Sequence, residues 1–96
     1  MSKPHDIEAI ISGVRSAVPN VEITQMHRTH PADDDGLWWF RLPQVSRNIQ
    51  IESSTYDCPF IVEHNGMTSD GEASRACSVA EAVSAIVDYL RSISTV

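Results

Sequence analysis

Basic residues are scarce in this chain of 96 residues. Seven lysines and arginines stand against thirteen aspartates and glutamates, which gives a formal net charge of -6 at pH 7. An acidic surface repels the phosphate backbone of nucleic acids, so this composition disfavours nucleic-acid binding. It fits a basic partner protein, although the same charge also keeps many cytosolic proteins dissolved.

Long hydrophobic runs are missing as well. The first twenty residues mix charged side chains with isolated isoleucines, so the sequence predicts neither a signal peptide nor a membrane span. Cysteine is limited to Cys58 and Cys77, which lie outside any C-x-x-C spacing. We therefore expect a cytoplasmic protein with two free thiols, no membrane contact and no cofactor, in which both cysteines are packing residues.

Low-complexity tracts and internal repeats are also absent. A hydrophobic content of 42% with 21% charged residues is ordinary for a globular protein. A chain of this length holds one hydrophobic core and leaves no room for a second. We therefore predict a single α+β domain over residues 1–96.

Aromatic residues are few, and both tryptophans fall in one short stretch, Leu37–Leu42. A period of two places Trp38, Phe40 and Leu42 on one face of a strand and Leu37, Trp39 and Arg41 on the other. Because both faces carry apolar groups, we expect an interior strand whose second face is partly covered.

Two segments show the period of an amphipathic helix. The first follows Asp6, a predicted N-cap, and ends before Pro19; its apolar stripe is Ile7, Ile10, Ile11, Val14 and Val18. The second follows the capping box Ser78-x-x-Glu81. Its stripe is Val79, Ala82, Val83, Ile86, Val87, Leu90 and Ile93.

Strand patterns fill the middle of the chain. Besides Leu37–Leu42 they cover Val21–His27, Arg47–Ser53, Phe60–His64 and a short edge strand within Ala73–Cys77. The predicted fold is a helix, an antiparallel meander of three to five strands and a second helix, with both helices on one sheet face. The other face would carry Leu37 or Trp39, Gln50, Glu52, Ile61 and Glu63. It is either a docking surface or an ordinary hydrated sheet face.

No residue stands out as catalytic. The candidates for binding a partner protein are Asp33, Asp34, Asp35, Trp39, Glu52 and Glu63, which combine an acidic loop with an aromatic anchor. His27-x-x-His30 beside that loop is an alternative metal site, and Cys58 is an alternative nucleophile in a small enzyme. Cys58 lies between Asp57 and Pro59, and the aspartate disfavours a thiolate there.

Four segments together carry a resemblance to known proteins: Gly36-Leu-Trp-Trp-Phe-Arg-Leu-Pro43, Ile49-Gln-Ile-Glu-Ser-Ser54, Cys58-Pro-Phe-Ile-Val-Glu63 and Ser78-Val-Ala-Glu-Ala-Val83. The arrangement resembles small uncharacterised bacterial proteins, similar in size and character to immunity proteins that neutralise a partner toxin. The likeness spans about residues 36 to 93. It implies a cytoplasmic inhibitor that binds by surface complementarity, and it transfers no active-site residue.

The leading hypothesis is therefore a small acidic protein-binding module, an immunity-type or regulatory inhibitor of a basic partner protein. One alternative is a small enzyme or a ligand- or metal-binding protein that uses the His27 and His30 loop or Cys58. Another is a homodimer joined through the sheet face or an edge strand.

Overall fold

The structure, a computed structural model, describes residues 5–26, 36–64 and 74–94. Helix α1 (Asp6–Ala17) comes first and helix α2 (Val79–Ser92) comes last. Between them are five strands: β1 (Glu22–Gln25), β2 (Leu37–Arg41), β3 (Asn48–Glu52), β4 (Phe60–His64) and β5 (Ser74–Ala76). This element order confirms the predicted α+β class.

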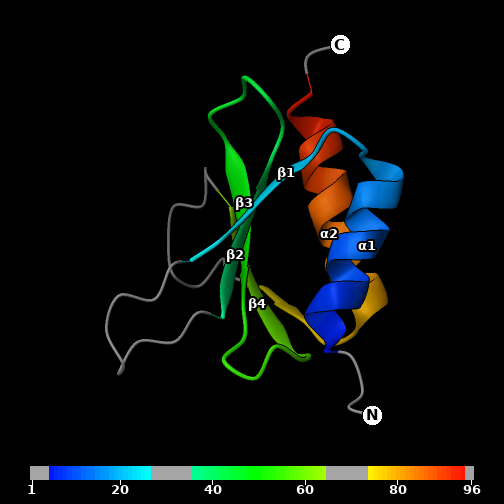
Figure 1. The fold of residues 1–96 in the computed structure, drawn as a ribbon, viewed down its shortest axis with the longest axis vertical. Helices are drawn as coiled ribbons and strands as arrows, with labels where there is room; N and C mark the ends of the chain where they lie inside the picture. Colours follow the sequence, from blue (N-terminus) through cyan, green and yellow to red (C-terminus); the bar gives the residue numbers. More distant parts are fainter. Residues whose placement is uncertain (1–4, 27–35, 65–73, 95–96) are drawn as a thin grey trace.

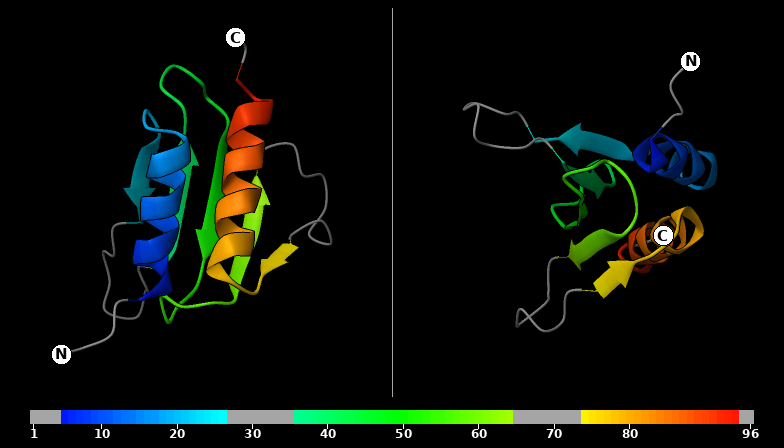
Figure 2. Two further views of the ribbon diagram at one scale, coloured as in Figure 1. Left: turned by 90° about the vertical axis from the view of Figure 1, so that its right-hand side faces the viewer. Right: turned by 90° about the horizontal axis from the view of Figure 1, so that it is seen from below.

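The strands form one antiparallel sheet in the order β1-β2-β3-β4-β5, so each strand pairs with its neighbour along the chain. Both helices lie side by side on one face of this sheet (Figures 1 and 2). The predicted meander, with its helices packed on one face, is therefore confirmed. Neither helix has the length and apolar character needed to cross a membrane, as judged over the described residues.

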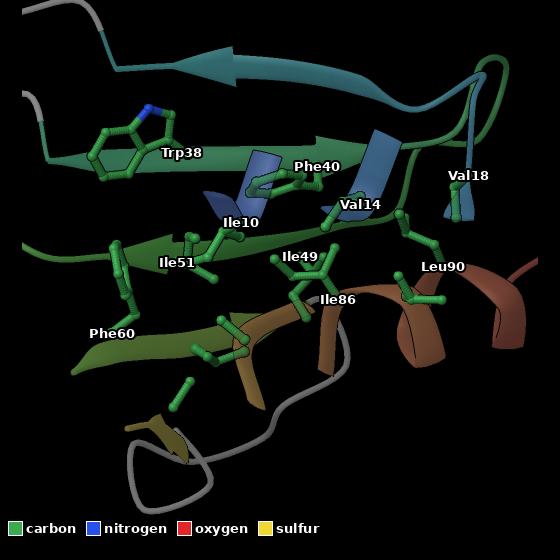
Figure 3. Packing of buried hydrophobic residues seen from close by; sticks show 14 of the residues in the cluster. Ile10, Val14, Val18, Trp38, Phe40, Ile49, Ile51, Phe60, Ile86 and Leu90 are labelled. Carbon is green, nitrogen blue, oxygen red and sulfur yellow. The ribbon is translucent and has the colours of Figure 1, made fainter. Parts of the chain in front are cut away.

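The core lies between the sheet and the two helices (Figure 3). The inward strand side chains are Trp38, Phe40, Ile49, Ile51, Phe60, Val62 and Ala76, all nearly inaccessible to solvent. The helices add Ile7, Ile10, Val14, Ala82, Ile86, Val87 and Leu90. The alternation predicted for β2, β3 and β4 and both predicted helical stripes are confirmed. Burial of this apolar surface is the main force that holds helices and sheet together.

The first residue of α1 differs from the prediction. His5 is the N-cap, and Asp6 is the first helical residue. The Asp6 carboxylate accepts a hydrogen bond from the backbone N–H of Cys58, at 2.9 Å, instead of capping its own helix. The backbone N–H of Asp6 donates to Oδ1 of Asp57, also at 2.9 Å. Asp57, which lies in the turn between β3 and β4, thus provides the side-chain acceptor at the helix start that the sequence pattern assigned to Asp6.

Helix α2 begins as predicted. The Ser78 hydroxyl accepts from the backbone N–H of Glu81 at 3.1 Å, and the Glu81 carboxylate accepts from the backbone N–H of Cys77 at 2.9 Å. Together the two side chains satisfy N–H groups that have no partner inside the helix.

The edge strands are shorter than their sequence patterns. Strand β1 covers four residues of the predicted Val21–His27, and His27 lies outside the described residues. Strand β5 covers three residues of the predicted Ala73–Cys77, and it confirms a short edge strand there. Short edge strands limit the backbone available for pairing with other chains.

Candidate functional site

The second face of the sheet carries the side chains that alternate with the core residues. We call this surface the outer face; its members are Glu22, Thr24, Leu37, Trp39, Arg41, Asn48, Gln50, Glu52, Ile61, Glu63 and Arg75. No helix or strand of residues 5–26, 36–64 and 74–94 lies over it (Figure 1). It is therefore a regular surface that no described helix or strand covers.

A line of hydrogen bonds crosses the middle of the outer face. The register sets Trp39 opposite Gln50, and Gln50 opposite Glu63. The indole Nε1 of Trp39 donates to Oε1 of Gln50 at 3.2 Å, and Nε2 of Gln50 donates to Oε2 of Glu63 at 3.3 Å. These bonds orient a half-buried indole and a carboxylate that still has acceptor capacity for a basic group.

The next row of the ladder combines an apolar side chain with both charges. Ile61 is 41% exposed, a large value for an isoleucine, and it lies between Glu52 and Arg75. The three residues line a hollow of about 500 Å³ together with the hydroxyl-rich turn Ser53–Thr55 and Pro59. Glu52 and Arg75 form no ion pair within the described parts of the chain.

Two other outer-face charges do pair. Arg41 Nη2 lies 2.8 Å from Glu22 Oε1, and both side chains are about half exposed. Such a pair adds little stability, because water screens it and two long side chains lose freedom to form it. The pair nevertheless neutralises the corner of the face where β1 begins and β2 ends. The outer-face charges that form no ion pair among the described residues are Glu52, Glu63 and Arg75, on β3, β4 and β5.

The structure brings together part of the predicted binding set. Trp39, Glu52 and Glu63 all lie on the outer face. Asp33, Asp34 and Asp35, and the alternative ligands His27 and His30, fall outside the described residues. Within the described ranges, the His, Cys, Asp and Glu side chains form no group of three that would hold a metal ion.

The two cysteines differ in their surroundings. Cys58 is partly buried against the core, as predicted, whereas Cys77 is exposed, so its prediction as a buried packing residue was wrong. Burial, followed by a hydrogen bond to Asp6 and the charges of Asp6 and Asp57, raises the pKa of the Cys58 thiol from 9.0 to about 11. A raised pKa leaves little thiolate near neutral pH, which argues against a nucleophilic role for Cys58.

Alkylation of the folded protein at pH 8 is expected to modify Cys77 well before Cys58. A rise of two pKa units lowers the thiolate fraction by about 100-fold. Timed treatment with iodoacetamide followed by peptide mass spectrometry measures both rates, and unfolding in urea should make them similar. Equal rates in the folded protein would contradict the assigned environment.

The raised pKa of Cys58 also makes the free energy of unfolding depend on pH. Because only the folded state keeps the Cys58 thiol proton between pH 9 and 11, we expect the free energy of unfolding to fall as pH rises through that range.

One cluster near the start of α1 was not predicted. Nδ1 of His5 lies 3.3 Å from Oδ2 of Asp57, and the His5 ring packs edge-on against Tyr56, which packs edge-on against Trp38. The backbone N–H of Ile7 donates to the carbonyl of Tyr56 at 3.1 Å. These contacts join α1 to the turn between β3 and β4, so we assign the cluster a role in the fold.

Comparison of the chain with protein-family models, with curated proteins and with solved structures found no match in any of the three. The resemblance to immunity proteins therefore stays an expectation from the sequence.

Proposed function

We propose that this protein is a small acidic binding module that docks a basic partner protein on its outer face. The observation that carries the proposal is the line Trp39, Gln50 and Glu63, which holds an aromatic ring and a carboxylate in fixed positions. Tryptophan is among the residues that most often dominate binding energy at protein interfaces. A carboxylate nearby favours a lysine or arginine on the partner protein.

The charge distribution supports a basic partner protein. The formal net charge is -6, and the acidic run Asp33-Asp34-Asp35 belongs to the segment that joins β1 to β2, the strand that carries Trp39. Long-range attraction between opposite charges speeds the encounter of two proteins, while apolar contacts hold the complex once it has formed. In this proposal the acidic run steers the partner protein and Trp39 anchors it.

An immunity-type inhibitor is the specific form of the proposal that the sequence resemblance supports. Such a protein acts by covering a functional surface of its target and needs no reaction of its own. A sheet face with one aromatic anchor and an oriented carboxylate beside it provides the chemistry for that mode of inhibition. The target would be a protein whose functional surface is basic.

The first experiment identifies the partner protein and maps its site at the same time. Wild-type protein and the Trp39→Ala variant serve as baits in a lysate of the source organism, at low and at high salt. We expect a basic protein that wild type retains at low salt only and that the variant loses. With the purified partner, Trp39→Ala should raise the dissociation constant by roughly 30-fold, which corresponds to about 2 kcal/mol.

A matched pair of acid-to-amide variants tests the face. Glu63→Gln removes a charge from the outer face, and Asp88→Asn removes the same charge from exposed α2 on the helix side of the sheet, where Asp88 lines a hollow beside β5. We expect Glu63→Gln to slow association severalfold and Asp88→Asn to change it little. Equal effects of the two variants would show that only net charge matters, and the outer-face site would be abandoned.

Alanine at Asp33, Asp34 and Asp35 together tests the steering role of the acidic run. The triple variant should associate more slowly and show a weaker dependence on salt. If affinity and salt dependence both stay at wild-type values, the acidic run has no part in binding.

A further inference from the structure

One row of the outer face runs from Leu37 on β2 through Glu52 and Ile61 to Arg75 on β5, and its last three members are centred on an apolar residue. The ladder pairs Glu52 with Ile61 and Ile61 with Arg75, so a carboxylate and a guanidinium lie one strand to either side of an exposed isoleucine. Adjacent strands are about 4.8 Å apart. Both charged residues are exposed, and neither forms an ion pair inside the described segments. The row thus offers one cationic and one anionic contact around an apolar centre.

Such a row is complementary to itself. The outer faces of two copies can stack through a two-fold axis that lies between them, runs parallel to β4 and passes at Ile61. This axis exchanges the two sides of the sheet about β4. It places β3 of one copy over β5 of the other, so Glu52 meets Arg75 of the second copy and Arg75 meets its Glu52. The two Ile61 side chains meet at the axis. One symmetry operation therefore satisfies both charges and covers the most exposed large apolar side chain of the described residues.

We propose that a second copy of this chain docks on the β3, β4 and β5 half of the outer face, and that the free protein is a two-fold dimer. This inference goes beyond the proposed function. A basic partner protein fits this row less well, because Arg75 repels a cationic group that approaches Glu52. A second copy brings a carboxylate and a guanidinium in the required order.

The same axis sets a limit on the strength of the dimer. Glu63 lies one row above Ile61 on β4, so the two Glu63 carboxylates approach each other across the axis. Like charges in an interface disfavour association. The apolar contribution comes mainly from Ile61, so the dimer is of the weak, transient kind. Strand β2 has no counterpart in this arrangement, which leaves Trp39 outside the contact.

Dimerisation and the proposed partner protein compete, since both cover Glu63. One substitution separates them. Glu63→Gln should weaken binding of the basic partner protein, as described above, yet it should tighten the dimer by removing the like-charge contact. Glu63→Gln would then act in opposite directions on dimerisation and on binding of the basic partner protein, which distinguishes the two contacts.

The experiment is sedimentation velocity of the purified chain alone, over a concentration series from about 1 μM to about 1 mM. Wild type should pass from monomer to dimer. Glu52→Arg places two guanidinium groups together, and Arg75→Glu places two carboxylates together, so each should weaken the dimer at least about tenfold. Arg15→Glu makes the same charge reversal as Arg75→Glu on an exposed position of α1, which packs on the other sheet face, and should leave the equilibrium unchanged.

Exchanging the charges of Glu52 and Arg75 tests whether these two residues meet across the dimer interface. The double variant Glu52→Arg, Arg75→Glu restores both opposite-charge contacts and should dimerise again. An equimolar mixture of the two single variants should also dimerise, because each supplies the charge that the other lacks. Circular dichroism of each variant verifies that the fold is retained.

Wild-type protein that stays monomeric throughout the series would overturn the proposal. Dimerisation that neither single variant weakens would place the contact elsewhere and overturn it equally. Failure of both the double variant and the mixture to recover would exclude the two-fold arrangement. Because the purified chain is measured alone, none of these outcomes depends on whether the basic partner protein exists.

Discussion

Substitution Phe40→Ala is expected to lower the free energy of unfolding by about 3–5 kcal/mol. Phe40 has no exposed surface and lies on interior strand β2, between the sheet and the helices (Figure 3). Removing its ring loses apolar burial and leaves a cavity that rigid neighbours on β3 and the helices fill poorly. Since small domains are stable by only about 5–15 kcal/mol, the variant should be partly or fully unfolded. Urea denaturation followed by circular dichroism measures the change.

The matched control is Ile61→Ala on β4, which removes an apolar side chain from the outer face. Ile61 is 41% exposed, so its loss leaves no enclosed cavity, and we expect a change of about 1 kcal/mol or less. A loss at Phe40 no greater than the loss at Ile61 would contradict the assignment of inner and outer sheet faces.

Substitution Gly36→Ala should destabilise the protein by about 1–3 kcal/mol, in spite of adding only a methyl group. A Cβ atom at Gly36 would overlap the backbone carbonyl oxygen of Ser53 and lie 2.8 Å from its carbonyl carbon. The carbonyl of Gly36 also accepts a hydrogen bond from the backbone N–H of Ser53 at 2.8 Å. Backbone atoms cannot move away by a change of rotamer as side-chain atoms can. Strands β2 and β3 must therefore separate at this end, which weakens the hydrogen bond. Thermal unfolding reports the loss.

Gly13→Ala is the control for this second expectation. A Cβ at Gly13, on α1, would lie 2.9 Å from Cγ2 of Val83 on α2, a side chain that can shift. Alanine also favours the helix over glycine by about 1 kcal/mol, which offsets the crowding. We expect a net change much smaller than at Gly36. If Gly13→Ala proves the more damaging of the two, the packing between the helices is tighter than the sheet pairing.

The elements of the fold could be predicted because their patterns are local. The period of two in β2 and β3 assigned each side chain to a face, and the spacing of Ser78 and Glu81 located the start of α2. The start of α1 could not be predicted in the same way. The Glu8 carboxylate accepts locally from the backbone N–H of the N-cap His5, but the backbone N–H of Asp6 donates to Asp57, which is 51 residues away in the sequence. No local pattern reports a contact of that range.

The candidate site was predictable to a similar extent. Alternation placed Trp39, Glu52 and Glu63 on one face, but it did not reveal that Gln50 bridges Trp39 and Glu63, because that bond depends on strand register. Arg75 was missed as a member of the face. The signal was available, since buried Ala76 sends its neighbour to the other side of β5, but so short a strand gives little basis for reading alternation.

The contact between α1 and α2 has a consequence for synthesis of the chain. These helices belong to opposite ends of the sequence, yet they pack side by side over the same sheet (Figure 2). A nascent chain that has emerged only as far as Ala76 can pair all five strands, because each pairs with its predecessor. It cannot yet cover Ile49 or Phe60 with Ile86 and its neighbours on α2. Until α2 has emerged from the ribosome, the growing chain presents part of its future interior to water and to chaperones.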